Sequence, residues 1–251
     1  MGSRRDAILR EMGLGPLWRL RVPPAANDVS ATPAGLSVSA IPPAADIPAP
    51  GDGAATDSRA SAIASLDWPA LAAAVADCRA CGLCRGRKQA VLGVGDREAD
   101  WLFVGEGPGA EEDERGEPFV GQAGKLLDAM LAAIGLRRGA DVYIGNAVKC
   151  RPPNNRTPEA AETAACWPYL ARQIDLIRPR LIVALGRPAA QTLLNADVKI
   201  GAARGRLFDH RGIPLIVTYH PAYLLRNLTD KAKAWEDLLF MRRTMRGLKD
   251  A

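Results

Sequence analysis

The segment DWLFVGEG (residues 100–107) decides the fold class, because it is a short apolar run that ends in a glycine-rich turn. Three later segments have the same form: DVYIGNAV (141–148), PRLIVALG (179–186) and IPLIVTYH (213–220). Continuous apolar runs of this length are typical of strands that are buried on both faces of a parallel sheet. The four runs therefore predict four buried strands.

Helical patterns separate these runs. They are GQAGKLLDAMLAAIGL (121–136), TPEAAETAACWPYLARQIDLI (157–177) and RPAAQTLL (187–194). We expect Thr157 to be the N-cap of the second helix, because Pro158 suits the first helical position. Strands that alternate with helices predict an α/β fold, with a central parallel-type sheet flanked by helices on both faces. In such sheets, ligands bind at the carboxyl ends of the strands.

Polar residues follow the predicted strands at three of these ends. The segments are GEGPGAEED (105–113), GNAVKCRPPNN (145–155) and YHPAYLLRN (219–227). Taken separately, each has a structural explanation: a tight turn, a turn-forming Asn146, and a His220 bonded to a backbone carbonyl. Together they favour a binding site, because parallel strands bring their carboxyl ends to one edge of the sheet.

The N-terminal part differs in composition from the rest. Residues 1–22 form a short amphipathic peptide, whose apolar set is Ile8, Leu9, Met12, Leu14, Leu17 and Trp18. Residues 23–62 are rich in Ala, Pro, Ser and Gly and lack aromatic side chains, so we expect a disordered linker there. The globular domain is then predicted over residues 63–251.

Hydropathy and charge limit the class of protein. No apolar run approaches the roughly 20 residues that cross a bilayer, and no secretory signal is present, so we expect a cytoplasmic protein. A reducing cytoplasm disfavours structural disulfides. The chain has 33 Lys and Arg against 28 Asp and Glu, a net charge of +5, and the excess falls in the globular part. This balance agrees with a polyanionic partner such as nucleic acid.

The segment CRACGLC (78–84) holds three of the five cysteines, whereas Cys150 and Cys166 follow far downstream. This spacing suits a disulfide, a redox pair or a metal site, and the expected compartment disfavours the disulfide. Both CRAC and CGLC have the spacing of a metal-binding pair, and four thiolates suit zinc as well as an iron–sulfur cluster. The spacing alone leaves the metal and the first pair of ligands open.

Long motifs carry a resemblance to a known family. GEGPGAEEDERGEPFVGQAGKLLD, YIGNAVKCRPPNNRTP with Cys166 after it, and TYHPAYLLRN together resemble the family-4 uracil-DNA glycosylases, the iron–sulfur type. The resemblance covers roughly residues 78–240, with the motifs in the family's order. It implies a [4Fe–4S] cluster held by Cys78, Cys81, Cys150 and Cys166, with Cys84 as a spare thiol. If CGLC supplied the first pair instead, Cys84 would replace Cys78.

The resemblance also implies the reaction and its residues. The enzyme would flip uracil out of DNA and hydrolyse its N-glycosidic bond, which leaves an abasic site for base excision repair. The catalytic residues would be Glu106, which positions water, and His220, which donates to uracil O2. The residues that bind the base would be Gly107, Glu112, Phe119 and Asn146. Phe119 would stack on uracil, Asn146 would pair with its N3–H and O4 edge, and Glu112 would lie near C5.

The loop after His220 is expected to contact DNA. Leu224 and Leu225 are apolar side chains suited to filling the gap left by a flipped base, and the spacing favours Leu224. Arg226 would hold a phosphate or the orphaned partner base. Basic residues near the second motif are expected at the DNA backbone: Lys149, Arg151 and Arg156.

Two other classes of function compete with catalysis. The first is a protein that binds or traps uracil-DNA without turnover, but such relatives have GEQPG and a histidine-bearing insertion, whereas this chain has GEGPG. The second is an iron–sulfur redox protein. We expect a monomer in the cytoplasm, associated with the nucleoid. Residues 3–22 weakly resemble the N-terminal segment of the psi subunit of the bacterial clamp loader, so a replication-machinery partner is a further hypothesis.

Overall fold

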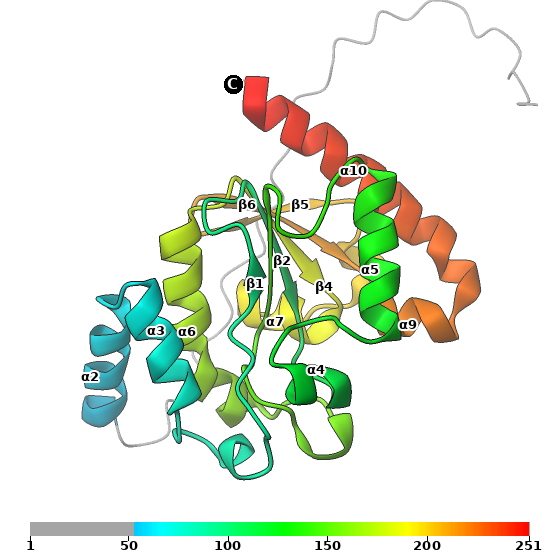
Figure 1. Ribbon diagram of the computed structural model, residues 1–251. Helices are drawn as coiled ribbons and strands as arrows, with labels where there is room; N and C mark the ends of the chain where they lie inside the picture. The colour runs from blue at the N-terminus through cyan, green and yellow to red at the C-terminus, as the bar shows by residue number, and fades with distance from the viewer. Residues whose placement is uncertain (1–52, 251) are drawn as a thin grey trace, which may run out of the picture. The chain divides into compact units, whose positions relative to one another are not determined.

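The computed structural model describes residues 53–250, with side chains from Ser58 onward (Figure 1). They contain a six-stranded sheet with the order β1-β3-β2-β4-β6-β5. The strands are β1 (Val94–Gly95), β2 (Trp101–Gly105), β3 (Val142–Asn146), β4 (Leu181–Leu185), β5 (Leu207–His210) and β6 (Ile213–Thr218). The amphipathic peptide 1–22 and residues 23–52 of the predicted linker lie outside the described residues.

The four predicted strands are confirmed as β2, β3, β4 and β6, which pair in parallel at the centre of the sheet. The two edge strands, β1 and β5, are antiparallel to their neighbours and were not predicted. The chain runs from β2 to β3 on one side and then crosses to β4 on the other side of β2. The carboxyl end of β2 is therefore a topological switch point, where sheets of this kind bind ligands.

Helices cover both faces of the sheet, as the alternating pattern predicted (Figure 1). They are α2 (Gly53–Ala64), α3 (Trp68–Ala76), α4 (Ala110–Arg115), α5 (Gln122–Ala133), α6 (Ala160–Ile177), α7 (Arg187–Leu194), α8 (Ile200–Ala203), α9 (Pro221–Arg226) and α10 (Lys231–Asp250). Within residues 53–250, three short 3-10 helices lie in the connections: η1 (Gly82–Arg85), η2 (Pro153–Asn155) and η3 (Leu228–Asp230).

The core is divided between the two faces by the alternation of side chains along each strand. On one face, Phe103 and Val183 pack with side chains of α5, α9 and α10. On the other face, Leu102 and Ile182 pack with side chains of α6 and α7. All of these strand residues are buried. Burial on both faces explains why the strand sequences are continuously apolar.

Two boundaries differ from the prediction. Helix α2 begins at Gly53, inside the segment predicted as linker, so the predicted boundary at residue 62 is wrong. Apart from Ile63, its sequence lacks bulky apolar residues, but it is rich in Ala, which favours helix, and it packs against α6. Helix α6 begins at Ala160 with Glu159 as its N-cap, so the predicted cap at Thr157 is also wrong. Glu162 in the first turn accepts from the backbone N of Glu159 (2.8 Å).

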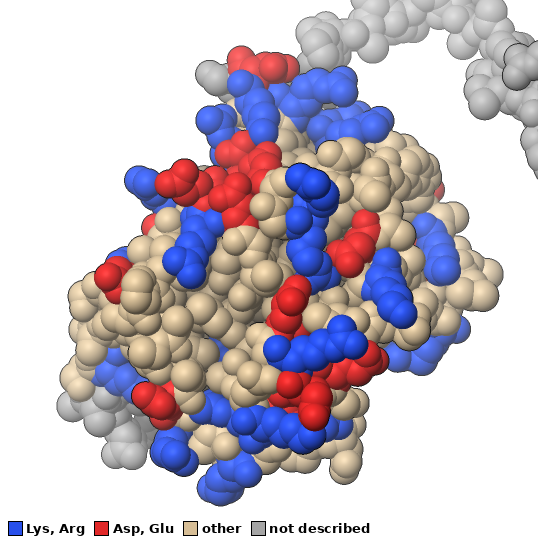
Figure 2. Space-filling model, viewed as in Figure 1, with Lys and Arg blue, Asp and Glu red and all other residues tan. Residues whose placement is uncertain are grey.

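The surface carries both signs of charge. Figure 2 shows Lys and Arg interspersed with Asp and Glu on the face viewed in Figure 1. Lys and Arg gather around the C-terminal end of α10, where Arg242, Arg243 and Arg246 are exposed. Across the described residues, no helix has the length and apolar character needed to span a bilayer.

Candidate active site

A pocket of about 720 Å³ opens at the carboxyl ends of the central strands. Glu106 follows β2, Asn146 ends β3, Gly186 follows β4 and His220 follows β6, and all four line the pocket. Phe119, in the loop between α4 and α5, also lines it. The three strand ends that the sequence analysis singled out therefore meet at one site, because parallel pairing places them at the same edge.

Asn146 is a buried polar residue with an unused acceptor. Its side chain is 2 % exposed, and its Oδ1 has no hydrogen-bond partner among the described residues. A Cβ atom added at Gly105 would lie 2.5 Å from Asn146 Oδ1 and 2.6 Å from Phe119 Cζ, so both side chains converge over the bare backbone of Gly105. Buried acceptors are almost always paired in folded proteins. This oxygen is thus placed to receive a donor from a bound ligand.

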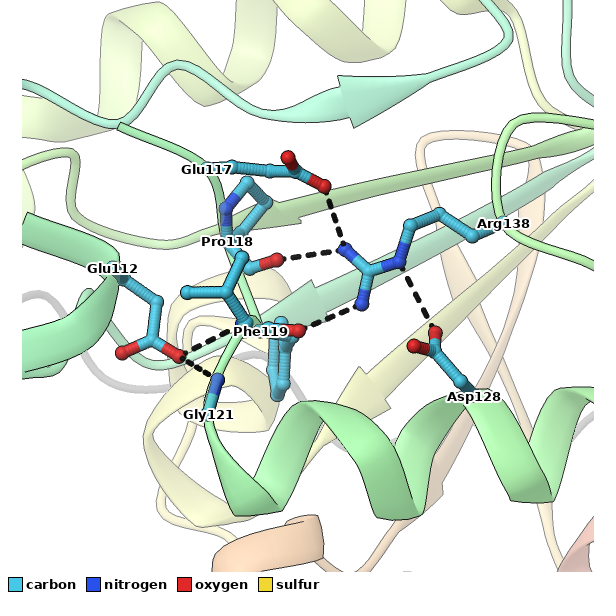
Figure 3. Close-up of polar contacts among 8 residues, drawn as sticks. Glu112, Glu117, Pro118, Phe119, Gly121, Asp128 and Arg138 are labelled. Atoms are coloured by element: carbon cyan, nitrogen blue, oxygen red, sulfur yellow. Dashed lines mark hydrogen bonds and ion pairs between the residues drawn. The ribbon is translucent and has the colours of Figure 1, made fainter. Parts of the chain in front are cut away.

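Phe119 is held in the left-handed backbone region, with a φ of 55°. Its ring is 5 % exposed and stacks against the ring of His220, with a centroid distance of 5.5 Å. Figure 3 shows the Phe119 loop between Glu112 on one side and Arg138 on the other. Glu112 Oε1 accepts from the backbone N of Val120 (3.0 Å), and Glu112 Oε2 accepts from that of Gly109 (3.1 Å). The carboxylate of Glu112 is therefore fixed by the backbone while it lines the pocket.

His220 is a neutral hydrogen-bond donor in this site. It is the N-cap residue of α9, and its Nδ1 accepts from the backbone N of Ala222 (3.1 Å). Because Nδ1 is the acceptor, the ring proton of the neutral imidazole lies on Nε2. Burial, aided by the nearby charge of Arg226, lowers the pKa of His220 to about 4. The side chain can thus donate from Nε2 at neutral pH without carrying a charge.

Glu106 is half-buried at the end of β2, and burial raises the pKa of its carboxyl group above the usual value. Gly107 follows it at the pocket wall, where an added Cβ would lie 2.8 Å from Val148 Cγ2. The site thus places the carboxyl group of Glu106 and the neutral imidazole of His220 after two different strands. This pairing suits the stabilisation of a cation on one side of a bond and an anion on the other.

The two leucines after His220 lie in different environments. Leu224 is 1 % exposed and packs in the core with α5 and α10, which leaves it unavailable to DNA in this conformation. Leu225 is 40 % exposed, and Arg226 is exposed at the rim of the pocket. The sequence analysis favoured Leu224 as the apolar wedge. Its burial contradicts that preference, because Leu224 lies on the face of α9 that packs against the core.

Lys149 does not contact DNA as expected, because its side chain is 1 % exposed. Its Nζ donates to the backbone O of Asn146 (2.9 Å) and to Gln173 Oε1. Arg156 is paired with Glu162, with 2.7 Å between Nη2 and Oε1, although it lines the pocket. The sequence pattern identified these residues as basic but did not reveal which of them are buried or paired.

Other residues at the pocket were not predicted. Arg187 begins α7 just after β4 and lines the pocket, while its guanidinium pairs with Asp197 (2.8 Å). Tyr219 and Tyr223 stack in parallel at the pocket wall, with ring centroids 5.1 Å apart. Arg187 follows the predicted strand at 179–186, so the rule that located the other three strand ends would also have located it.

The five cysteines line one small cavity next to α3 and α6, beside the side chains of Arg87, Lys149 and Tyr169. Cys78, Cys81, Cys150 and Cys166 also belong to one packed cluster, in which Cys84 takes no part. Donors point at the sulfurs: Arg87 Nη1 lies 2.8 Å from Cys150 Sγ, and the backbone N of Lys149 lies 3.2 Å from Cys166 Sγ. Such donors are typical of the surroundings of iron–sulfur clusters.

Within residues 53–250, no group of three or more His, Cys, Asp or Glu side chains is arranged to hold a single metal ion. The cysteine side chains share the lining of one small cavity without forming a ligand set for a single ion.

Comparison with known proteins agrees with the pocket and its motifs. Residues 92–239 match the family model of the uracil DNA glycosylase superfamily, and the chain belongs to this superfamily. Within it, the chain groups with type-4 uracil-DNA glycosylases.

Three type-4 uracil-DNA glycosylases illustrate the similarity. The protein from Pyrobaculum aerophilum is 44% identical over 181 residues, which cover 69% of this chain and 92% of that protein. The protein from Archaeoglobus fulgidus is 48% identical over 159 residues, 60% of this chain and 79% of that protein. The protein from Thermotoga maritima is 48% identical over 161 residues, 63% of this chain and 83% of that protein.

Proposed function

We propose that this protein excises uracil from DNA by hydrolysing the N-glycosidic bond, as the first step of base excision repair. The observation that carries the proposal is the buried, unpaired Oδ1 of Asn146 in a pocket that also contains Phe119 and His220. This acceptor has no donor among the described residues, and uracil presents one at N3–H. The base would enter the pocket only after it is flipped out of the DNA stack.

Recognition of the base rests on Asn146 and Phe119. The Oδ1 of Asn146 accepts from uracil N3–H, and its Nδ2 donates to uracil O4. Cytosine has the reverse pattern of donor and acceptor, so it would leave buried groups unpaired, which is costly. The ring of Phe119 stacks on the flipped base, and Glu112, fixed by backbone amides, forms the wall near C5. These contacts support a narrow preference for uracil.

Bond cleavage rests on His220 and Glu106. As the C1′–N1 bond breaks, its electron pair moves to the base, so negative charge builds up on uracil O2. This oxygen accepts a hydrogen bond from Nε2–H of His220. The carboxylate of Glu106 stabilises the cationic sugar and holds the water whose oxygen bonds to C1′. The proton that this water loses neutralises the uracil anion. Gly107 adds a backbone contact beside Glu106. The neutral state of His220 favours hydrogen bonding over proton transfer.

Contact with DNA is assigned to the rim of the pocket. We assign the apolar wedge to Leu225, because it is the exposed member of the leucine pair. Arg226 would hold a phosphate or the orphaned base, since it is exposed at the rim beside the wedge. Uracil-containing DNA is thus the proposed partner.

Cys78, Cys81, Cys150 and Cys166 would hold a [4Fe–4S] cluster. When bound, the cluster would act as a structural link between the segment that follows α3 and the segment that joins β3 to α6. Hydrolysis of a glycosidic bond requires no electron transfer, and four cysteine ligands leave no open position for substrate. The packing of Cys78, rather than Cys84, with the other three supports this set of ligands.

Release of free uracil from an oligonucleotide with a single uracil tests the proposal. Under multiple turnover, an enzyme releases many equivalents of uracil, a trapping protein holds at most one, and a redox protein releases none. Replacing Glu106 or Asn146, or making His220→Gln, is expected to cut the release severely. His210→Gln is the matched control, because His210 is the other histidine, is buried, and does not line the pocket.

Residues 3–22 support a separate proposal, which rests on the sequence alone. The peptide would dock on the replication machinery through the chi subunit of the clamp loader, which is the subunit that psi binds. The protein itself would be a monomer in the cytoplasm, associated with the nucleoid. Docking would bring it to newly incorporated uracil. Deleting residues 1–22 should leave excision of an oligonucleotide unchanged and abolish pull-down of chi. A melting temperature lowered by the deletion would instead place the peptide in the fold.

A further inference from the structure

The loop that carries Phe119 is held in a backbone conformation that it would not keep unaided. Phe119 is not glycine, yet its φ of 55° lies in the left-handed region, which residues with a Cβ atom rarely adopt. Bulky residues stay in this region only where neighbouring contacts impose it. The contacts around residues 117–121 therefore decide where the ring of Phe119 lies.

Arg138 makes the contacts on one side of this loop. Its guanidinium donates from Nη1 to the backbone O of Pro118 and from Nη2 to that of Phe119, both at 2.8 Å (Figure 3). Its Nε donates to Asp128 Oδ1 (3.1 Å) on α5, which orients the fork. The Arg138 side chain is 19% exposed, so these bonds are shielded from solvent. The planar fork of arginine binds both carbonyls at once, which lysine cannot reproduce.

The other side of the loop is also closed. Glu112 Oε1 accepts from the backbone N of Val120 (3.0 Å) and of Gly121 (3.3 Å). Helix α5 approaches so closely that a Cβ added at Gly124 would lie 1.7 Å from the backbone O of Phe119. The guanidinium of Arg138 thus holds the carbonyls of Pro118 and Phe119, and the carboxylate of Glu112 holds the amides of the two residues that follow. Arg138 supplies the half of this clamp that lies away from the pocket, since Glu112 lines the pocket and Arg138 does not.

We propose that Arg138 is a positioning residue for uracil excision, which fixes the backbone of Phe119 so that its ring keeps its place beside His220 and Asn146. The proposal rests on the proposed function, in which Phe119 stacks on the flipped base. Arg138 acts only through Phe119 and touches neither the base nor the sugar. Its effect should therefore appear in the rate of the bound complex rather than in the affinity for DNA.

The test compares Arg138→Met with Arg137→Met in the full-length protein with its cluster. Arg137 is the neighbouring residue and is exposed. Its replacement by Met removes the same charge and the same side-chain atoms, but it removes no contact with the loop. The single-turnover rate of uracil release at saturating enzyme is expected to fall by about 10- to 100-fold in Arg138→Met, the range for misplaced catalytic groups. Arg137→Met should stay near the wild-type rate, and DNA affinity should be unchanged in both variants.

A double-mutant cycle with Phe119→Leu separates positioning from general stability. If Arg138 acts through Phe119, Arg138→Met should slow the Phe119→Leu variant far less than it slows the wild type. Arg138→Lys, which can reach only one carbonyl, should give an intermediate rate. It replaces Arg138→Met in the cycle if the methionine variant does not fold.

Three results would overturn the inference: an unchanged rate in Arg138→Met, an equal loss in both backgrounds, or a loss matched by Arg137→Met. Failure of the proposed function is a different outcome, because the wild-type protein and Arg137→Met would then release no uracil at all.

Discussion

Removing the unpaired acceptor of Asn146 should weaken recognition of uracil strongly without destabilising the protein. Asn146 is 2 % exposed, and its Oδ1 has no partner among the described residues. A buried polar group without a partner costs about 1–3 kcal/mol of folding free energy. Asn146→Ala removes this cost, and the space that it leaves opens into the pocket, so no sealed cavity forms.

The expected free energy of unfolding is unchanged or higher by up to about 2 kcal/mol, after allowance for the lost packing of the side chain. For a domain of this size, each kcal/mol shifts the melting temperature by about 2–4 °C. Thr218→Ala is the matched control. Thr218 is fully buried, but its Oγ1 donates to Asp237 Oδ2 (2.7 Å). Removing this satisfied bond to a carboxylate should lower the free energy of unfolding by about 1.5–3 kcal/mol.

The expected loss of activity follows from the same groups. In Asn146→Ala, uracil N3–H and O4 both enter the pocket without partners, at about 1–3 kcal/mol each. A total of about 2–6 kcal/mol corresponds to a fall of about 30-fold to 20,000-fold in the rate of excision, at about 1.4 kcal/mol per tenfold. The assays are thermal melting and single-turnover release of uracil. A melting temperature lowered as far as in Thr218→Ala would refute the reasoning, as would excision within about fivefold of wild type.

Three further predictions concern the pH dependence of excision, the cysteine ligands of the cluster and the leucine that acts as the wedge. Because burial raises the pKa of Glu106 and its carboxylate form is the active one, excision should fall with decreasing pH at a midpoint above the usual carboxyl range. The pKa of His220, lowered to about 4, should add no loss between pH 8 and that midpoint, and a rate that instead rises toward pH 6 would contradict a neutral His220. The purified protein should contain about four irons per chain, retained in Cys84→Ser and lost in Cys78→Ser; the reverse pattern would assign the first pair to CGLC. Leu225→Ala should slow excision from double-stranded DNA more than from single-stranded DNA, whereas Leu224→Ala should lower the melting temperature, and an exchange of these two effects would restore Leu224 as the wedge.

Local sequence predicted the four central strands and three of the helices, and it placed polar residues at three strand ends. The runs that became β2, β3, β4 and β6 are short and apolar throughout, and burial on both faces requires that composition wherever the strand lies. The edge strands lack such runs, because β1 has only two residues and those of β5 alternate between buried and more exposed positions. The Ala-rich helix α2 was missed because its packing against α6 depends on residues about a hundred positions away.

The residues of the candidate site also divide into those that the sequence predicted and those that only the structure revealed. Glu106, Asn146 and His220 were predictable, because each follows an apolar run and parallel strands place such ends at one edge. Sequence patterns are local, so they do not reveal what a side chain contacts when its partners lie far along the chain. Only the tertiary structure decided that Leu224 is buried while Leu225 is exposed, and that Lys149 lies beneath Asn146 rather than on the surface. It also placed Arg138 against the carbonyls of Pro118 and Phe119, because the packing of the loop against α5 brings together residues twenty positions apart.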